Sequence, residues 1–111
     1  MKVIKFAEIQ IKEYVEAIRP PEDFRDQVDV SYWYKNDIIE IFEIRPNWQD
    51  EKIKENFPIA RTKYVKSKKI WRIYWLTGNQ KWIQYKPNAE VKSILEFIEV
   101  LKKDKTGCFW G

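Results

Sequence analysis

Apolar residues recur at three- and four-residue steps in two segments of the chain, one near each end. The first stripe stops at Pro20 and Pro21 and consists of Ile4, Ala7, Ile11, Tyr14, Val15 and Ile18. The second follows Pro87, has Asn88 as its expected N-cap, and consists of Val91, Ile94, Leu95, Ile98 and Leu101. This spacing collects apolar side chains on one face of a helix, so we predict an amphipathic helix near each end.

The segment between the helices alternates in the manner of β-strands. Five strands are predicted, at residues 27–34, 38–45, 59–66, 70–77 and 81–86. The short turns between most of them join antiparallel neighbours only, whereas residues 46–58 form a longer polar connection with room for one helical turn. The predicted architecture is α+β in a single domain, residues 1–111: a helix, a five-stranded antiparallel meander sheet and a helix, with both helices packed on one face of the sheet.

The chain contains no histidine and a single cysteine, Cys108. These counts exclude an internal disulfide, a cysteine metal cluster and every catalytic arrangement that needs histidine, so we assign no catalytic residue, metal ligand or cofactor. Neither a signal peptide nor an apolar run long enough to span a membrane is recognisable, which favours a cytoplasmic protein. Six Trp, six Tyr and six Phe exceed the needs of a small core, so some are expected on the surface.

Basic residues are concentrated in one part of the chain. Residues 58–87 carry eight basic and no acidic side chains, while residues 26–57 carry four basic and eight acidic ones. The net charge of +4 therefore conceals a basic unit of three predicted strands beside an acidic unit of two. A basic surface of this kind attracts anionic partners, although a run of charge is also common on an ordinary solvated face.

The turns decide which side chains of the basic unit lie opposite one another. A two-residue turn between the third and fourth strands places Lys63 opposite Arg72. A two-residue turn before the fifth strand places Trp75 opposite Trp82 and Arg72 opposite Tyr85. Alternation then sorts the basic unit into two surfaces.

One surface is expected to face the helices and holds Ala60, Thr62, Tyr64, Trp71, Ile73, Trp75 and Trp82. The other interleaves cations with aromatic and aliphatic side chains, including Leu76 and Ile83. We call it the basic-aromatic face, and its candidate binding residues are Arg61, Lys63, Arg72, Tyr74, Lys81 and Tyr85.

Like charges in directly opposed positions destabilise a sheet, so Lys63 against Arg72 needs an explanation. Three explanations are open at this point. An anion such as phosphate binds between the two cations, or Glu40 or Glu43 of the acidic unit neutralises them, or the register is shifted by one residue.

Ordered aromatic and proline positions give the chain a resemblance to a known family. The positions are Arg19-Pro20-Pro21, Phe42-Glu43-Ile44-Arg45-Pro46 with Trp48, Pro58-Ile59-Ala60 with Lys63, Trp71, Tyr74-Trp75, Asn79, Lys81-Trp82, Tyr85, Lys105-Thr106-Gly107 and Phe109-Trp110-Gly111. From about Arg19 to its last residue the chain resembles the uncharacterised bacterial family named domain of unknown function 3024, to which no activity is assigned. The family tends to place a histidine where this chain has Ile83. A reaction that used that histidine would be lost here, whereas binding through the same face would survive.

Nucleic acid is the partner that the basic-aromatic face favours. In sequence-tolerant single-strand binders, cations contact phosphates while bases stack on aromatic rings. Tyr74 and Tyr85 are the expected stacking platforms, and Arg61, Lys63, Arg72 and Lys81 are the expected backbone contacts.

Two other classes of function remain open. Asp37, Glu43 and Lys63 loosely match the carboxylates and lysine of a metal-dependent nuclease, although the uninterrupted meander lacks the helical crossover of such enzymes, and Glu43 with Arg45 also suits a cross-strand salt bridge. In a protein-interaction or structural module, the acidic and basic halves would pair two copies, or the aromatic face would dock an acidic protein surface.

The last four residues, Cys108 to Gly111, are expected to form a hydrophobic plug on the sheet rather than a docking tag. Cys108 is expected to be a small buried apolar residue rather than a reactive thiol.

Overall fold

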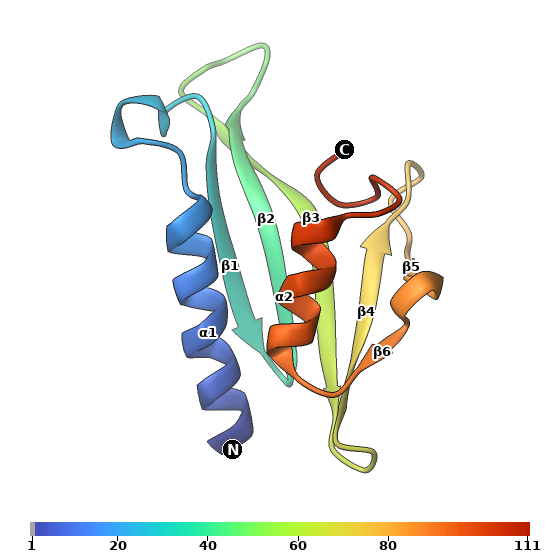
Figure 1. Ribbon diagram of the computed structural model, residues 1–111. Helices are drawn as coiled ribbons and strands as arrows, with labels where there is room; N and C mark the ends of the chain where they lie inside the picture. The colour runs from blue at the N-terminus through green and yellow to red at the C-terminus, as the bar shows by residue number, and fades with distance from the viewer. Residues whose placement is uncertain (1) are drawn as a thin grey trace.

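Two helices and a six-stranded antiparallel sheet make up this protein (Figure 1). The structure is a computed structural model that describes residues 2–111, with side chains described from Lys5 onward. The elements in order are α1 (Lys2–Ile18), the 3-10 turn η1 (Glu22–Phe24), β1 (Asp29–Lys35), β2 (Ile38–Pro46), β3 (Lys54–Val65), β4 (Ile70–Leu76), β5 (Trp82–Gln84), the 3-10 turn η2 (Lys86–Asn88), β6 (Glu90–Val91) and α2 (Ile94–Lys103). The predicted α+β order of helix, strands and helix is confirmed.

The sheet contains one strand more than the predicted meander. Strands β1 to β5 follow one another in space as in sequence, and β6 pairs with β4 on the edge that β5 also occupies. The pairs of β6 are Trp71 with Val91 and Arg72 with Glu90. The prediction placed Val91 in a helix; instead the turn η2 brings the chain back along β4, where two residues add to the ladder.

Strand β3 begins earlier than predicted, at Lys54, so only residues 47–53 form the connection from β2. The sequence prediction stopped at Pro58 because proline normally breaks a ladder. In the structure Pro58 opposes Phe42 next to a register shift after Ile41. A bulge is one of the few places where a strand tolerates proline, so β3 continues through it.

Helix α2 begins at Ile94 rather than just after Pro87. Its N-cap is Ser93, whose hydroxyl accepts a hydrogen bond of 3.2 Å from the backbone N–H of Glu96. This Ser-x-x-Glu arrangement is a recognised start signal, and it corrects the predicted Asn88 cap. The buried side of the helix also differs from the predicted apolar stripe. Leu95, which the stripe included, is 54% exposed, and Phe97, which it omitted, is completely buried.

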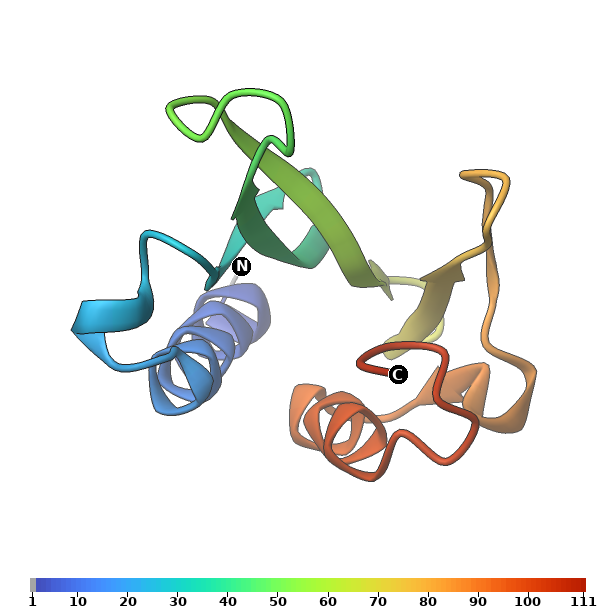
Figure 2. The same ribbon diagram turned by 90° about the horizontal axis from the view of Figure 1, so that it is seen from above.

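The core lies between the helices and one face of the sheet, which we call the helix face. Figure 2 shows both helices on the same side of the sheet, with α1 against β1 and α2 against β4 and β6. The helices contribute Ala7, Ile11, Tyr14, Val15, Ile94, Phe97, Ile98 and Leu101, and the strands contribute Val30, Ile39, Ile41, Ala60, Trp71 and Ile73. Of the predicted α1 stripe, Ile18 is partly exposed at the helix end, and the side chain of Ile4 lies outside the described residues.

Arg19 fixes the path from α1 to β1. Its Nε and Nη2 atoms each donate a hydrogen bond of 2.9 Å to the carboxylate of Asp29, the first residue of β1. Pro20 and Pro21 end the helix just before this contact, since neither can donate a backbone hydrogen bond. Arg19 is therefore a structural residue.

The C-terminal segment folds back onto the core. Asp104 ends α2 in the left-handed conformation, and its carboxylate accepts backbone hydrogen bonds from Phe109 (3.1 Å) and Trp110 (2.8 Å). Phe109 is buried against the ring of Tyr85, at a centroid distance of 4.8 Å. Cys108 is half-buried rather than fully buried, with Sγ 3.0 Å from the hydroxyl of Thr106.

We predict that Phe109→Ala lowers the free energy of unfolding by about 3 kcal/mol and the melting temperature by roughly 10 °C, because it removes a buried aromatic ring. Phe24 is the matched control, since it is 55% exposed and Phe24→Ala should change stability by less than about 0.5 kcal/mol. Thermal and urea unfolding of the two variants makes the comparison. Equal stability of the two would contradict the structural role of the C-terminal segment.

The Arg19–Asp29 pair should also make stability depend on pH. The hydrogen bond from Arg19 holds the pKa of the Asp29 carboxyl below its usual range, so the ionised form favours the folded state. The stabilisation is complete above the ordinary aspartate pKa of about 3.9 and is lost as pH falls through the lower folded pKa. Asp29→Asn should therefore reduce the urea midpoint at pH 7, and its deficit should shrink below pH 4. A deficit that is the same at both pH values, or an equal one for Asp23→Asn, would contradict the assignment.

Candidate functional site

The register of the basic unit agrees with the prediction on one side of β4 and differs from it on the other. Between β3 and β4, Lys63 lies opposite Arg72 and Arg61 opposite Tyr74, as predicted. Between β4 and β5, Trp82 lies opposite Leu76 rather than opposite Trp75. The turn is the reason: it spans the five residues 77–81, closed by a hydrogen bond of 2.9 Å from the N–H of Thr77 to the carbonyl of Lys81. An odd number of residues in place of two shifts the register by one and turns every side chain of β5 over.

This shift removes Tyr85 from the predicted binding surface and leaves Lys81 outside the strand. Tyr85 is 2% exposed and packs in the core on Phe109, so it is not a stacking platform. Lys81 lies in the turn before β5, where its backbone N–H donates to the hydroxyl of Thr77. Ile83, where the resemblance implied a histidine, pairs with Trp75 and so does not share the face of Arg61.

The shift also adds a tryptophan that the sequence analysis had placed in the core. We call the side of the sheet away from the helices the open face; it carries Arg61, Lys63, Arg72 and Tyr74 as predicted. Trp82 joins them, because its position opposite Leu76 turns it to this side. In Figure 2 the turn between β4 and β5 rises on the same side.

Arg61 forms the centre of a cluster that joins four strands. Its Nε and Nη2 atoms donate hydrogen bonds of 3.1 and 2.6 Å to Oε1 of Glu40 on β2. Its guanidinium carbon lies 4.4 Å from the ring centroid of Trp82 and 5.7 Å from that of Trp33 on β1. Trp33 completes the cluster by donating its indole N–H to Oε2 of Glu40 at 3.2 Å. Both tryptophans therefore have cation–π contact with one cation.

Neutralisation within the fold explains why the basic unit is stable. Glu40 is 6% exposed and pairs with Arg61, while Arg72 pairs with Glu90 of β6 at 3.3 Å. One of the three explanations required Glu40 or Glu43 to neutralise the Lys63–Arg72 pair, and neither does so. Glu90 pairs with Arg72 alone, from a strand that the sequence analysis did not predict. Glu43 pairs with Arg45 at 3.1 Å.

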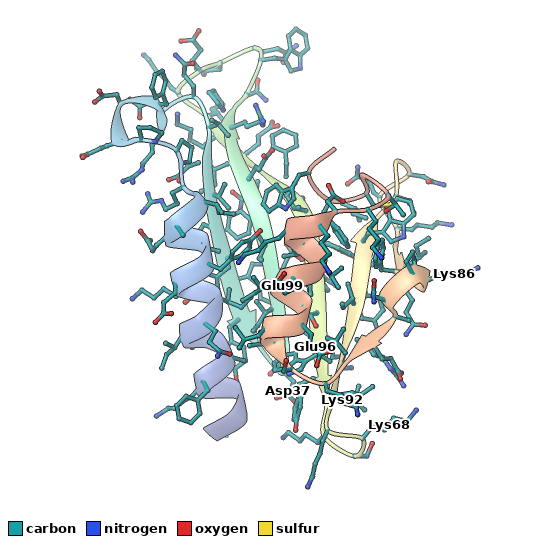
Figure 3. All side chains as sticks on the ribbon, viewed as in Figure 1. Asp37, Lys68, Lys86, Lys92, Glu96 and Glu99 are labelled. Atoms are coloured by element: carbon teal, nitrogen blue, oxygen red, sulfur yellow. The ribbon has the colours of Figure 1, made fainter. Side chains whose placement is uncertain are left out.

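Four lysines lie at the end of the sheet where β3 turns into β4. Among the residues with described side chains, Lys63, Lys68 and Lys69 take part in no ion pair, whereas Lys66 lies 3.7 Å from Asp37. Figure 3 shows Lys68 and Lys92 at the same end of the molecule, beside the turn between β3 and β4. We call Lys63, Lys66, Lys68 and Lys69 the basic end. Its lysines are exposed and next to the Arg61 cluster along β3.

The residues proposed for a nuclease do not form one site. Lys63 lies on the open face, while Glu43 lies opposite Val30 in the β1–β2 ladder and so faces the helices. Asp37 lies in the turn after β1 and pairs with Lys66. Within the part of the chain that the structure describes, no three carboxylate or thiol side chains are grouped so as to hold a metal ion.

Comparison with known proteins places the chain in a family. The model of the family described as Domain of unknown function (DUF3024) matches residues 2–111. The chain belongs to this family. No curated protein and no solved structure gives a significant match. The DUF3024 match extends through α1, further than the resemblance from Arg19 onward. None of the helices in the described residues combines the length and the apolar character of a membrane span.

We predict that Glu40→Ala lowers the free energy of unfolding by about 3 kcal/mol, because it leaves Arg61 partly buried without a counter-charge. Glu43 is the matched control on the same strand, since it pairs with the half-exposed Arg45 and its replacement by alanine should cost less than about 1 kcal/mol. Urea unfolding of both variants gives the two values. A cost for Glu40→Ala as small as that for Glu43→Ala would show that the cluster contributes little to stability.

Proposed function

We propose that this protein binds single-stranded nucleic acid, or a similar anionic polymer, across the open face and the basic end. The observation that carries the proposal is the position of the unpaired lysines next to an aromatic cluster on one surface. Phosphates would contact Lys63, Lys68 and Lys69, whose charges no acidic side chain compensates within the described residues. Bases would stack on rings that the sheet holds in place.

Arg61 and Arg72 take different parts from those expected from the sequence. Each already donates to a carboxylate, so neither is a free phosphate contact. Arg61 instead orients Trp82, because its guanidinium lies against the face of that ring. Trp82 replaces Tyr85 as a stacking platform beside Tyr74, and both are half-exposed.

Trp33 extends the aromatic surface to the other side of the cluster. It is 36% exposed, and its indole N–H already donates to Glu40, so the exposed part of its ring is available for contact. A single strand that crosses β1, β3 and β5 would meet both tryptophans and reach the basic end. A duplex hides the faces of its bases, so the aromatic contacts favour a single strand.

The test is a titration of a fluorescently labelled single strand with the protein at several salt concentrations. Lys63→Ala combined with Lys69→Ala should weaken binding and flatten the salt dependence, by about 0.7 in the slope of log K against log salt for each lysine. Lys5→Ala combined with Lys12→Ala removes the same charge from α1 and should leave the slope unchanged.

Trp82→Ala should weaken binding to the single strand by about 1–3 kcal/mol, through loss of stacking. No binding at low salt, or equal effects of the two lysine pairs, would overturn the proposal. Equal affinity for single strand and duplex, with no effect of Trp82→Ala, would point to charge alone and favour an acidic protein surface as the partner.

A further inference from the structure

A groove lies between α1 and α2, with the helix face of β1 and β2 as its floor (Figure 1). The two helices contact each other, so a single folded chain forms the whole groove. Its volume is about 860 Å³, within the range of about 300–1,000 Å³ that is typical of small-molecule sites. The groove is therefore large enough for a small organic molecule.

The walls of the groove are mostly apolar. They are formed by Tyr14 of α1, Val30 of β1, Ile98 and Leu101 of α2, and Trp110 of the C-terminal segment. These side chains are buried or half-buried, so packing against the rest of the fold holds them in place. They present a preformed surface to the hydrocarbon part of a ligand.

The floor of the groove changes from apolar to charged along β2. Side chains at alternate positions of a strand share one face, and on the helix face of β2 the completely buried Ile39 and Ile41 are followed by Glu43 and Arg45. Both charged side chains line the groove. Cavities that are only unfilled parts of a core are apolar, so this ion pair suits a ligand with a polar head.

Arg45 presents hydrogen-bond donors to the groove. Its Nε atom donates to Oε1 of Glu43 at 3.1 Å, whereas its two Nη groups donate to no other residue of the described part of the chain. The side chain of Arg45 is 50% exposed and that of Glu43 is 22% exposed. The guanidinium is therefore more accessible than the carboxylate, and its fork of N–H groups matches a carboxylate ligand.

A second cation lines the groove from the opposite wall. Lys102 of α2 has a distant partner in Glu99, at 3.7 Å, and both side chains are more than half exposed, so this pair contributes little. We propose that the groove binds a small apolar carboxylate. Its carboxylate contacts the Nη groups of Arg45, and its hydrocarbon body packs on Tyr14, Leu101 and Trp110.

Titration calorimetry with decanoate, below the concentration at which it forms micelles, tests the proposal. We expect saturable binding at a single site. Decylamine has the same hydrocarbon body with a positive head, and it should bind at least about tenfold more weakly, because it cannot accept hydrogen bonds from Arg45.

Variants of the charged groove residues separate the carboxylate site from general attraction. Arg45→Gln should weaken decanoate binding about tenfold, and Lys102→Gln should weaken it by a smaller factor. Lys103→Gln is the matched control, since Lys103 is the next residue of α2 but does not line the groove, and it should leave the affinity unchanged. Glu13→Gln should strengthen binding, because Glu13 is an acidic group of the α1 wall.

Ala17→Trp provides a steric test, because Ala17 lines the groove from α1 and a larger side chain there fills the space. It should abolish decanoate binding. All five altered side chains are exposed, so the variants should keep the thermal unfolding midpoint of the unchanged chain.

The absence of decanoate binding, or decylamine binding as tight as that of decanoate, would overturn the proposal. Equal effects of Lys102→Gln and Lys103→Gln, or unchanged affinity in Arg45→Gln or Ala17→Trp, would overturn it as well. Lys63→Ala combined with Lys69→Ala should leave decanoate binding unchanged, since neither lysine lines the groove. The outcome for nucleic acid on the open face is therefore independent of the outcome for the groove.

Discussion

The turn at residues 77–81 decides which side chains of the last meander strand face the core. Because it holds an odd number of residues, Tyr85 turns inward and Trp82 turns outward. The buried Tyr85 ring then provides the surface on which Phe109 packs, so the C-terminal segment depends on the same register. The outward Trp82 meets Arg61, so the cluster on the open face depends on it too. Core and surface thus follow from one turn.

Charge compensation is the second constraint, because the basic unit contains no acidic residue of its own. Glu40 comes from β2 and Glu90 from β6, and each pairs with an arginine of the basic unit. These two pairs stabilise strands that would otherwise repel one another. Lys63, Lys66, Lys68 and Lys69 add exposed positive charge at the end of the sheet where β3 turns into β4. The positive charge left without an ionic partner is therefore smaller than the count of basic residues indicates.

The two faces of the sheet offer contacts of opposite character. The open face combines lysines with Trp33 and Trp82, and this composition suits an anionic chain with flat bases. The helix side presents a groove with mostly apolar walls, which also carry Glu13, Glu43, Arg45 and Lys102.

The sequence by itself determined the α+β class, the two helices, the meander of β1 to β5 and the pairing of Lys63 with Arg72. Each follows from short-range periodicity or from the turn between β3 and β4, which has an even number of residues as predicted. The start of α2 could also have been predicted, since Ser93 and Glu96 form a capping pair that an analysis of apolar spacing alone missed.

Only the tertiary structure decided the face of Trp82 and Tyr85, the strand β6, and the partners Glu40 and Glu90. The physical reason is that a shift of one residue in a turn costs little locally but reverses a whole strand, and that ion pairs across a sheet join residues far apart in the chain. Periodicity carries no information on either.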